Sequence, residues 1–408
     1  MKISRNSLEK ILITILLLSS TKFLYITPLP KFFLQKASNV MCGAFFSVLI
    51  FFIFIFLNKQ IKLGTYGIEI WILYAIVVLN CIYMYLTYGY AVINLFYCIV
   101  PFLLLLGYFP IIQFAENDNN YIFLLKAIEF IAVLLSIILL FQKYRYDRTN
   151  LVFLKISLPD MFTGRFYDVS EGIIRIAVII SAYKIIIKNA KLLSFVSFIL
   201  CTLSIIFVDQ SRIYLLSVFI GIFVMIIINM FFSNKKGNIL IYVLLFIFGV
   251  FLISSIYTSL TNTLNNYNDG SNYARRDAMT YYLYIIKDHL WTGLGLYVPN
   301  VGEAYSDFIK GPLGIYNYSD IGIFGILASL GLGAVIWYVW CLIKGLVLSF
   351  NAKNKVLCFG LIGEMVVSMF TMAYFDSSRQ FSLMMVLALI SLNSNQKFKD
   401  RNSKKEIQ

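Results

Sequence analysis

The sequence is poor in charged residues, which make up 13% of its 408 residues, and it contains a single histidine, His289. Soluble globular domains carry about 25% charged residues. Hydrophobic residues make up 60% of this chain, and its mean hydropathy is +0.82. This composition excludes an ordinary soluble domain and predicts a polytopic membrane protein.

The sequence also lacks the short motifs of metal-dependent and nucleotide-dependent enzymes. It contains no DxD, no HExxH, no P-loop and no nucleotide-binding glycine pattern. Its six cysteines lie in or beside apolar segments, and none forms a CxxC or a metal-ligand spacing, so we interpret them as buried packing residues. The sequence therefore predicts neither a metal ion nor a cofactor.

Acidic residues are fewer than basic ones, and the formal net charge is +14. The lysines stand at the ends of apolar runs, where membrane topology and anionic lipid account for them. We therefore exclude nucleic acid as a partner and expect membrane lipid instead.

Apolar segments long enough to cross a membrane occur along most of the chain. A helix needs about 20 apolar residues to span a bilayer. The expected spans are 9–26, 40–57, 68–87, 90–113, 121–141, 172–189, 192–208, 212–231, 239–259, 319–343, 355–374 and 380–394. The sequence predicts an all-α polytopic membrane protein with roughly twelve transmembrane helices, in which residues 1–408 form a single integral membrane domain.

Two polar stretches interrupt this series, 142–171 after the fifth span and 260–318 between the ninth and the tenth. Lysines gather at one set of span ends, as expected for cytoplasmic ends. This distribution predicts that both termini are cytoplasmic and that both polar stretches are outer loops, the second of them large. The short link 115–120 carries no basic residue and gives no support to this assignment.

The ten arginines do not follow the lysines. In this topology eight of them fall at or near the outer face: Arg145, Arg148, Arg165, Arg175, Arg212, Arg275, Arg276 and Arg379. Because the planar guanidinium binds phosphate through two hydrogen bonds, we infer an outer-face site for a phosphorylated, lipid-linked substrate. The alternative is local ion pairing, in the pairs Glu171–Arg175, Asp209–Arg212 and Asp376–Arg379.

Residues 275–290 have an apolar stripe at helical spacing, formed by Met279, Tyr282, Leu283, Ile286 and Leu290. The stripe indicates an amphipathic helix along the outer membrane interface, with Ser271 or Asn272 as its N-cap. Arg275 falls on the stripe side and Arg276 on the opposite face. An arginine on the buried side is costly unless it meets an anion, so Arg275 is the stronger candidate; the alternative is contact with lipid phosphate.

Three acidic residues and the histidine remain as candidates. Asp320 stands where the second polar stretch re-enters the membrane, and it is either a general base or a helix N-cap. Glu129 and Glu364 fall inside expected spans, where ionisable residues are usually functional. His289 is expected at a helix end, where the helix dipole alone favours it.

Three stretches together resemble the Wzy / O-antigen ligase family of lipid-dependent membrane glycosyltransferases. They are FTGRFYDVSEG at 162–172, DQSRIYLL at 209–216, and ARRDAMTYYLYIIKDHLWTGLGL at 274–296, followed by the glycine-rich YSDIGIFGILASLGLG at 318–333. The first stretch lacks the Asn-Pro-Asn of many family members. The family's ligases place a histidine where the second loop re-enters the membrane, and this chain has Tyr318, Ser319 and Asp320 there. The resemblance therefore favours a repeat-unit polymerase over a ligase.

The resemblance implies an undecaprenyl-pyrophosphate-linked glycan as donor and a sugar hydroxyl of another lipid-linked repeat unit as acceptor. Arg212 and either Arg275 or Arg276 would stabilise the leaving pyrophosphate, and Asp320 would take the hydroxyl proton. We assign Arg165, Arg276, Tyr316 and Tyr318 to substrate binding. The outer arginines are equally suited to acidic sugars, and this alternative stays open.

The family also implies a location in the bacterial cytoplasmic membrane and two partners, a chain-length regulator and a flippase. The product would be O-antigen, capsular polysaccharide or exopolysaccharide. Besides a ligase, the alternative function is a lipid-linked oligosaccharide flippase or polysaccharide exporter. Such a transporter is expected to have two related halves, and the sequence has no internal repeat.

Overall fold

A computed structural model of the chain describes residues 4–19, 21, 38–150, 158–159, 166–167, 171–232, 270–296, 308–312, 314, 316–371, 374–375 and 379–405. These residues are helical except for turns, links and one antiparallel pair of two-residue strands, β1 (Leu158–Pro159) and β2 (Phe166–Tyr167). The first half of the chain contains α1 (Arg5–Ser19), α2 (Ser38–Asn58), α3 (Gly67–Tyr88), α4 (Val92–Ile99), η3 (Val100–Gly107), α5 (Tyr108–Phe114), α6 (Asp118–Thr149) and α7 (Glu171–Ile186). The second half contains α8 (Leu192–Ser204), η4 (Ile205–Asp209), α9 (Arg212–Phe232), α11 (Gly270–Ile285), η5 (Ile286–Asp288), η6 (Tyr318–Asp320), α13 (Ile323–Leu330), α14 (Leu332–Asn351), α15 (Lys355–Thr371) and α16 (Gln380–Lys405).

Six helices in the described part of the chain are long and apolar enough to cross a membrane. They are Gly67–Tyr88, Val92–Phe114, Asp118–Thr149, Leu192–Asp209, Ile213–Phe232 and Leu332–Asn351. Two shorter apolar helices, Cys42–Asn58 and Gln380–Ser394, accompany them. The expected α-helical polytopic membrane protein is confirmed, but the expected number of twelve spans is not, and the span 239–259 lies outside the described residues.

One expected span is interrupted. Residues 319–343 do not form a single helix, because α13 ends at Leu330 and α14 begins at Leu332. Gly331 between them has φ of +77°, a left-handed conformation that suits glycine and breaks the helix. The hydropathy of this segment is continuous, so the break could not be detected from apolar length.

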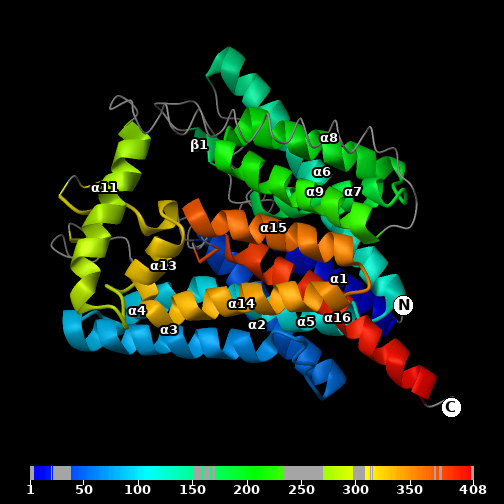
Figure 1. The fold of residues 1–408 in the computed structure, drawn as a ribbon, viewed down its shortest axis with the longest axis horizontal. Helices are drawn as coiled ribbons and strands as arrows, with labels where there is room; N and C mark the ends of the chain where they lie inside the picture. Colours follow the sequence, from blue (N-terminus) through cyan, green and yellow to red (C-terminus); the bar gives the residue numbers. More distant parts are fainter. Residues whose placement is uncertain are drawn as a thin grey trace.

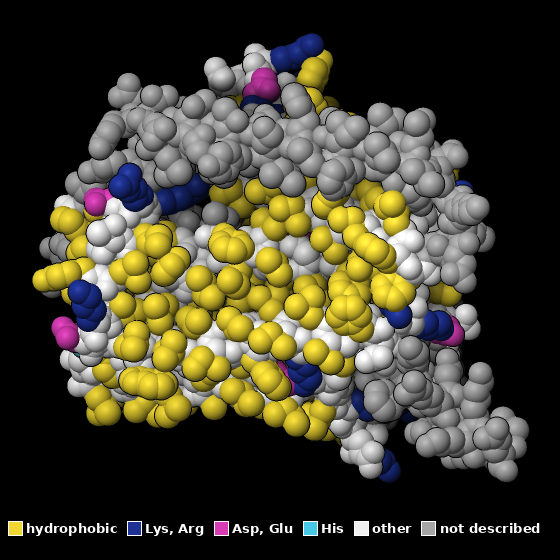
Figure 2. Space-filling model, viewed as in Figure 1, with side chains coloured by type: hydrophobic (Ala, Val, Ile, Leu, Met, Phe, Trp, Pro, Cys, Tyr) yellow, Lys and Arg dark blue, Asp and Glu magenta, His cyan; other side chains and the backbone are white. Residues whose placement is uncertain are grey.

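The apolar character of the spans is visible on the surface. Figure 2 shows hydrophobic side chains over most of the described part of one face. Large apolar side chains such as Phe56, Leu192 and Phe231 are almost fully exposed. An apolar surface of this extent is unfavourable in water and favourable in lipid.

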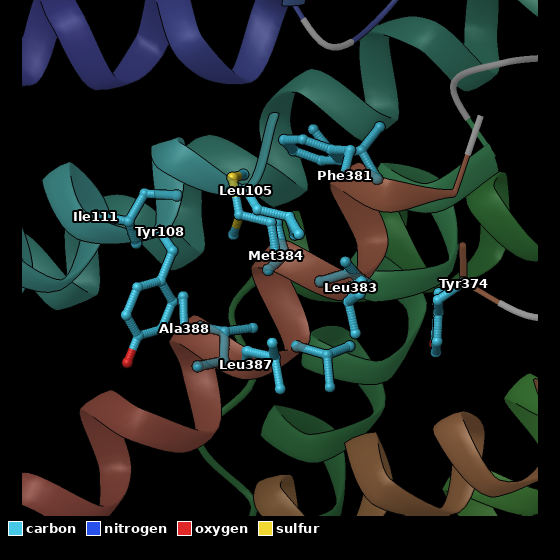
Figure 3. Close-up of a cluster of buried hydrophobic side chains, with 14 of the residues drawn as sticks. Leu105, Tyr108, Ile111, Tyr374, Phe381, Leu383, Met384, Leu387 and Ala388 are labelled. Atoms are coloured by element: carbon cyan, nitrogen blue, oxygen red, sulfur yellow. The ribbon is translucent and has the colours of Figure 1, made fainter. Parts of the chain in front are cut away.

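α16 is the buried centre of the bundle. Its residues 380–394 are all buried, as expected for a helix that is apolar on most of its circumference. Figure 3 shows Met384 and Leu387 of α16 near Leu105 and Tyr108 of η3 and α5. The Tyr108 hydroxyl donates to Ser391 Oγ at 3.0 Å, which adds a polar contact to this core.

α9 and α15 pack closely through glycine. A Cβ at Gly221 of α9 would lie 2.9 Å from the carbonyl oxygen of Gly360 in α15, and one at Gly360 would lie 2.5 Å from Met225 Cγ. Small residues allow membrane helices to approach at backbone distance. This contact fixes the start of α9 relative to the end of α15, where the candidate site is built.

Both termini lie at one end of the bundle and α11 lies at the other (Figure 1). At the end that carries the termini, Arg5 donates to Asn58, Lys62 pairs with Glu116, and Lys353 Nζ lies 3.4 Å from Asp118 Oδ1. These three contacts join links that the predicted topology places in the cytoplasm. Which end faces the cytoplasm remains a prediction.

Candidate active site

α11 presents one face to the rest of the protein. Ala278, Tyr282 and Ile286 are buried and form a separate small core with α13 and residues around 316–321. The expected stripe is therefore only partly right, because Leu283 and Leu290 are 36% and 42% exposed. The buried face of α11 packs on α13, and the placement of this helix along the outer membrane interface stays a prediction.

The two arginines of α11 lie on different faces, as the helical spacing indicates. Arg275 is half-buried on the side of Ala278 and Tyr282, and Arg276 is exposed. The helix begins at Gly270, so Ser271 and Asn272 lie within its first turn and neither is the N-cap. The cost of burying an arginine therefore applies to Arg275.

Tyrosine hydroxyls hold the next segment of the chain against α11. Tyr281 donates to the Phe308 carbonyl at 2.7 Å, and Tyr282 donates to the Ile309 carbonyl at 2.6 Å. Tyr316, which we expected to bind substrate, is buried and donates its hydroxyl to Asp277 of α11. The Tyr316 hydroxyl is therefore used in a contact within the protein, and its expected role in substrate binding stays a prediction.

Tyr318 differs from these tyrosines. Its ring lies 4.9 Å from that of Tyr282, and its buried hydroxyl has no hydrogen-bond partner. Burial raises the pKa of Tyr318 well above its ordinary value, so the hydroxyl stays protonated and can donate a hydrogen bond. Tyr316 and Tyr318 were both expected to contact substrate, and of the two only Tyr318 has a hydroxyl without a partner in the structure.

The Gly-x-Gly run after α11 closes the end of α13. Leu294 N donates to the Ala328 carbonyl at 2.7 Å, and Gly295 N donates to the Ser329 carbonyl at 3.2 Å. These bonds satisfy carbonyl groups that a helix end leaves without an intrahelical partner. Gly293 has φ of +66°, and a Cβ there would lie 2.7 Å from Gly331 N. Glycine at position 293 therefore allows the backbone of the Gly-x-Gly run to contact the backbone at the end of α13.

Asp320 is the last residue of η6, just before α13. Asn317 caps η6 by accepting a bond from Ser319 N at 3.2 Å, and the N-cap position of α13 is Gly322. The alternative assignment of Asp320 as a helix N-cap is therefore wrong. A Cβ at Gly322 would lie 2.3 Å from the Met369 carbonyl oxygen, so this segment touches the end of α15.

Arg379 connects the neighbours of two candidate catalytic residues. Its Nε donates to the Tyr214 hydroxyl at 3.0 Å, and its Nη1 donates to the Ser319 carbonyl at 3.1 Å. Tyr214 lies two residues after Arg212, and Ser319 precedes Asp320. The structure thus brings together the start of α9 and η6, although the side chains of Arg212 and Asp320, and all of Arg165, lie outside what it describes.

Arg175 has a partner that sequence spacing did not indicate. Its Nη1 lies 2.8 Å from Glu364 Oε1, and the two side chains are 2% and 1% exposed. Tyr374 donates its hydroxyl to the other oxygen of Glu364, and the Arg175 guanidinium lies 4.4 Å from the centre of the Tyr214 ring. Glu364 therefore belongs to a buried network that reaches Tyr214 in the first turn of α9. The positions 175 and 364 are too far apart in sequence for a spacing rule to pair them.

The other two acidic or basic candidates have structural partners. Glu129 Oε2 lies 2.6 Å from Lys184 Nζ, within the contact of α6 and α7. His289 Nδ1 lies 3.0 Å from the Tyr83 hydroxyl of α3, at the end of η5 as expected. The six cysteines are buried and free, as expected for packing residues. The described residues include no group of three or more metal-ligating side chains.

These elements define a helical membrane protein with a polar and aromatic assembly at one end, built from α9, α11, η6, α13 and the start of α16. Residues 196–339 match the family model for the Wzy_C domain, which is described as O-antigen ligase. The match is consistent with membership of the Wzy / O-antigen ligase family. It includes the motifs at 209–216 and 274–296, whereas the motif at 162–172 precedes it. Comparisons with curated proteins and with solved structures gave no match.

Proposed function

We propose that the protein is a polymerase that joins undecaprenyl-pyrophosphate-linked repeat units at the outer face of the bacterial cytoplasmic membrane. The observation that carries this proposal is the double contact of Arg379, which brings the start of α9 and η6 together within the segment that matches the Wzy_C domain. The proposed catalytic residues Arg212 and Asp320 stand beside these two contacts.

In the proposed reaction, a hydroxyl oxygen of the acceptor sugar forms a bond to the anomeric carbon of the donor glycan. The bond between that carbon and the pyrophosphate oxygen breaks, and undecaprenyl pyrophosphate leaves. The hydroxyl proton passes to the Asp320 carboxylate. The reaction therefore needs stabilisation of negative charge at the leaving group and a base at the acceptor.

The arginines supply the first of these requirements. Arg212 and Arg275 would donate charge-assisted hydrogen bonds to the pyrophosphate, each worth about 1.5–3 kcal/mol. The half-buried position of Arg275 favours it over exposed Arg276 for this role, because a guanidinium removed from water gains more from an anion. Arg276 and Arg165 remain candidates for holding more distant parts of the substrate.

Tyr318 is suited to the glycan rather than to the pyrophosphate. Its protonated hydroxyl is buried in an aromatic cluster two residues before Asp320, and a sugar hydroxyl that reached it would accept its hydrogen bond. We therefore keep Tyr318 as a substrate-binding residue and assign Tyr316 to holding η6 against α11.

A polymerase is favoured over a ligase by the position of the only histidine. His289 bonds to Tyr83 at the end of η5, whereas the stretch 318–320, where family ligases place a histidine, has none. This arrangement supports a base other than histidine, and Asp320 is in the appropriate segment.

Purified protein in lipid vesicles, supplied with lipid-linked repeat units, tests the proposal. A polymerase is expected to produce longer lipid-linked glycans and release undecaprenyl pyrophosphate, with a yield that Asp320→Asn lowers. Transfer only to an added lipid A–core acceptor would identify a ligase, and movement of the substrate across the bilayer without chain growth would identify a transporter. Either of the last two results would contradict the polymerase.

A further inference from the structure

We propose that Arg379 is a positioning residue that holds the Arg212 segment and the Asp320 segment at a fixed separation for catalysis. This inference rests on the proposed function, because it assigns roles to Arg212 and Asp320. Its own content is that the residue immediately before α16, outside the segment that matches the Wzy_C domain, sets the geometry of the site.

The two hydrogen bonds of Arg379 leave from different nitrogens and reach different parts of the chain. Nε reaches the Tyr214 hydroxyl at 3.0 Å, and Nη1 reaches the Ser319 backbone carbonyl at 3.1 Å. A planar guanidinium holds these two directions rigidly, whereas a lysine ammonium is a point charge on a flexible stem. Arg379 is 7% exposed, so water competes little for either bond.

Tyr214 is itself held by a second arginine. Its ring lies 4.4 Å from the Arg175 guanidinium and 5.8 Å from that of Arg379, so two cations lie near it. Arg175 is fixed in turn by the Glu364 carboxylate. Because these contacts restrict Tyr214, its bond to Arg379 fixes the guanidinium, and the guanidinium in turn fixes the Ser319 carbonyl.

The Asp320 segment has a second contact with the same framework. Gly322 lies so close to the end of α15 that a Cβ there would meet the Met369 carbonyl oxygen at 2.3 Å. This contact fixes the start of α13, whereas Arg379 fixes η6 just before it. Arg379 therefore controls the part of the chain that carries Asp320.

A cysteine label at Ser319 measures this positioning without any substrate. The side chain of Ser319 is partly exposed, and the six native cysteines are buried, so Ser319→Cys is expected to provide the fastest-reacting thiol. With Arg379→Gln added, the labelling rate of Cys at this position is expected to rise about tenfold or more, as a charge-assisted hydrogen bond is lost. Glu129→Gln, which removes a similarly buried charge from the α6–α7 contact, is the matched control and should leave the rate unchanged.

Kinetics supply the second measurement. Arg379→Gln is expected to lower kcat by about a hundredfold with little change in KM, because Arg379 places catalytic groups and does not hold the substrate. An unchanged labelling rate, or a normal kcat in the variant, would overturn the positioning role. If labelling rises but the wild-type protein forms no polymer, the polymerase proposal fails and the structural role of Arg379 stands.

Tyr214→Phe keeps the inference testable if Arg379→Gln does not fold. It removes only the hydroxyl that accepts from Nε and keeps the ring near the two guanidinium groups. Its labelling rate should lie between those of the parent and Arg379→Gln. A rate equal to that of the parent would contradict the role of this bond.

Discussion

At the scale of single residues, the arginines fall into two groups that the sequence did not separate. Arg175 and Arg379 are buried and contact Glu364, Tyr214 and the backbone of η6. Arg275 and Arg276 lie on the loop helix α11, one half-buried and one exposed. Helical spacing sufficed to assign the faces of α11, because those residues are close in sequence. It could not identify Glu364 as the partner of Arg175, since 189 residues separate them.

Arg212→Lys is expected to slow polymerisation by about 10- to 100-fold although the positive charge is kept. A lysine cannot reproduce a two-point contact with pyrophosphate. The measurement is product length and rate with lipid-linked repeat units, at equal membrane abundance. If Arg212 only pairs with Asp209, lysine should be tolerated, so wild-type kinetics would favour that local pair.

Asp320→Asn and His289→Gln are expected to differ strongly. The first removes the proposed proton acceptor and should lower the rate about 10²- to 10⁴-fold. The second should keep most activity, because His289 contacts Tyr83 and glutamine can retain a hydrogen bond there. Both variants are compared with the wild type for polymer formation and membrane abundance. An inactive His289→Gln beside an active, equally abundant Asp320→Asn would assign the base to histidine.

At the scale of elements, the apolar runs predicted most helices but not their interruptions. The segment 319–343 divides into α13 and α14 at Gly331, because the Gly-x-Gly run docks there through backbone hydrogen bonds. Hydropathy contains no information about such a contact between distant backbones. The Gly-x-Gly motif could be recognised in the sequence. Its contact with the end of α13 could not be predicted without knowing where α13 lies.

Gly293→Ala is expected to destabilise this docking and reduce activity, whereas Gly314→Ala should have a small effect. Both glycines have similar positive φ values, +66° and +68°, so the backbone strain of alanine is comparable. Only at Gly293 would the added Cβ meet another backbone, at 2.7 Å from Gly331 N, while nothing lies within 4 Å at Gly314. Thermal unfolding of the purified variants measures the difference, and equal stabilities would contradict the docking contact.

At the scale of the whole molecule, a polytopic helical membrane protein follows directly from composition, and the structure confirms it with six long apolar helices in its described part. The expected twelve spans include the segments of α7 and α15, whose described helices have 16 and 17 residues. The orientation in the membrane is a prediction from the distribution of lysine.

We expect α11 and the loop around Asn266 to face the outside and both termini to face the cytoplasm. Cysteines placed at Asn266 and at exposed Lys287 should react with a membrane-impermeant reagent added to intact cells. A cysteine at exposed Lys59, at the end that carries the termini, should react only after the membrane is opened. The reverse pattern would contradict both the topology and an outer-face site.

The central position of α16 also has a consequence for biosynthesis. α16 follows all the other described helices in the sequence, yet η3, α5, α7, α14 and α15 surround it. A ribosome therefore completes the surrounding helices before it makes the one that they enclose. The earlier helices must either leave a space in the membrane for α16 or rearrange when it arrives. The network around Arg379, the residue just before α16, can assemble only after that step.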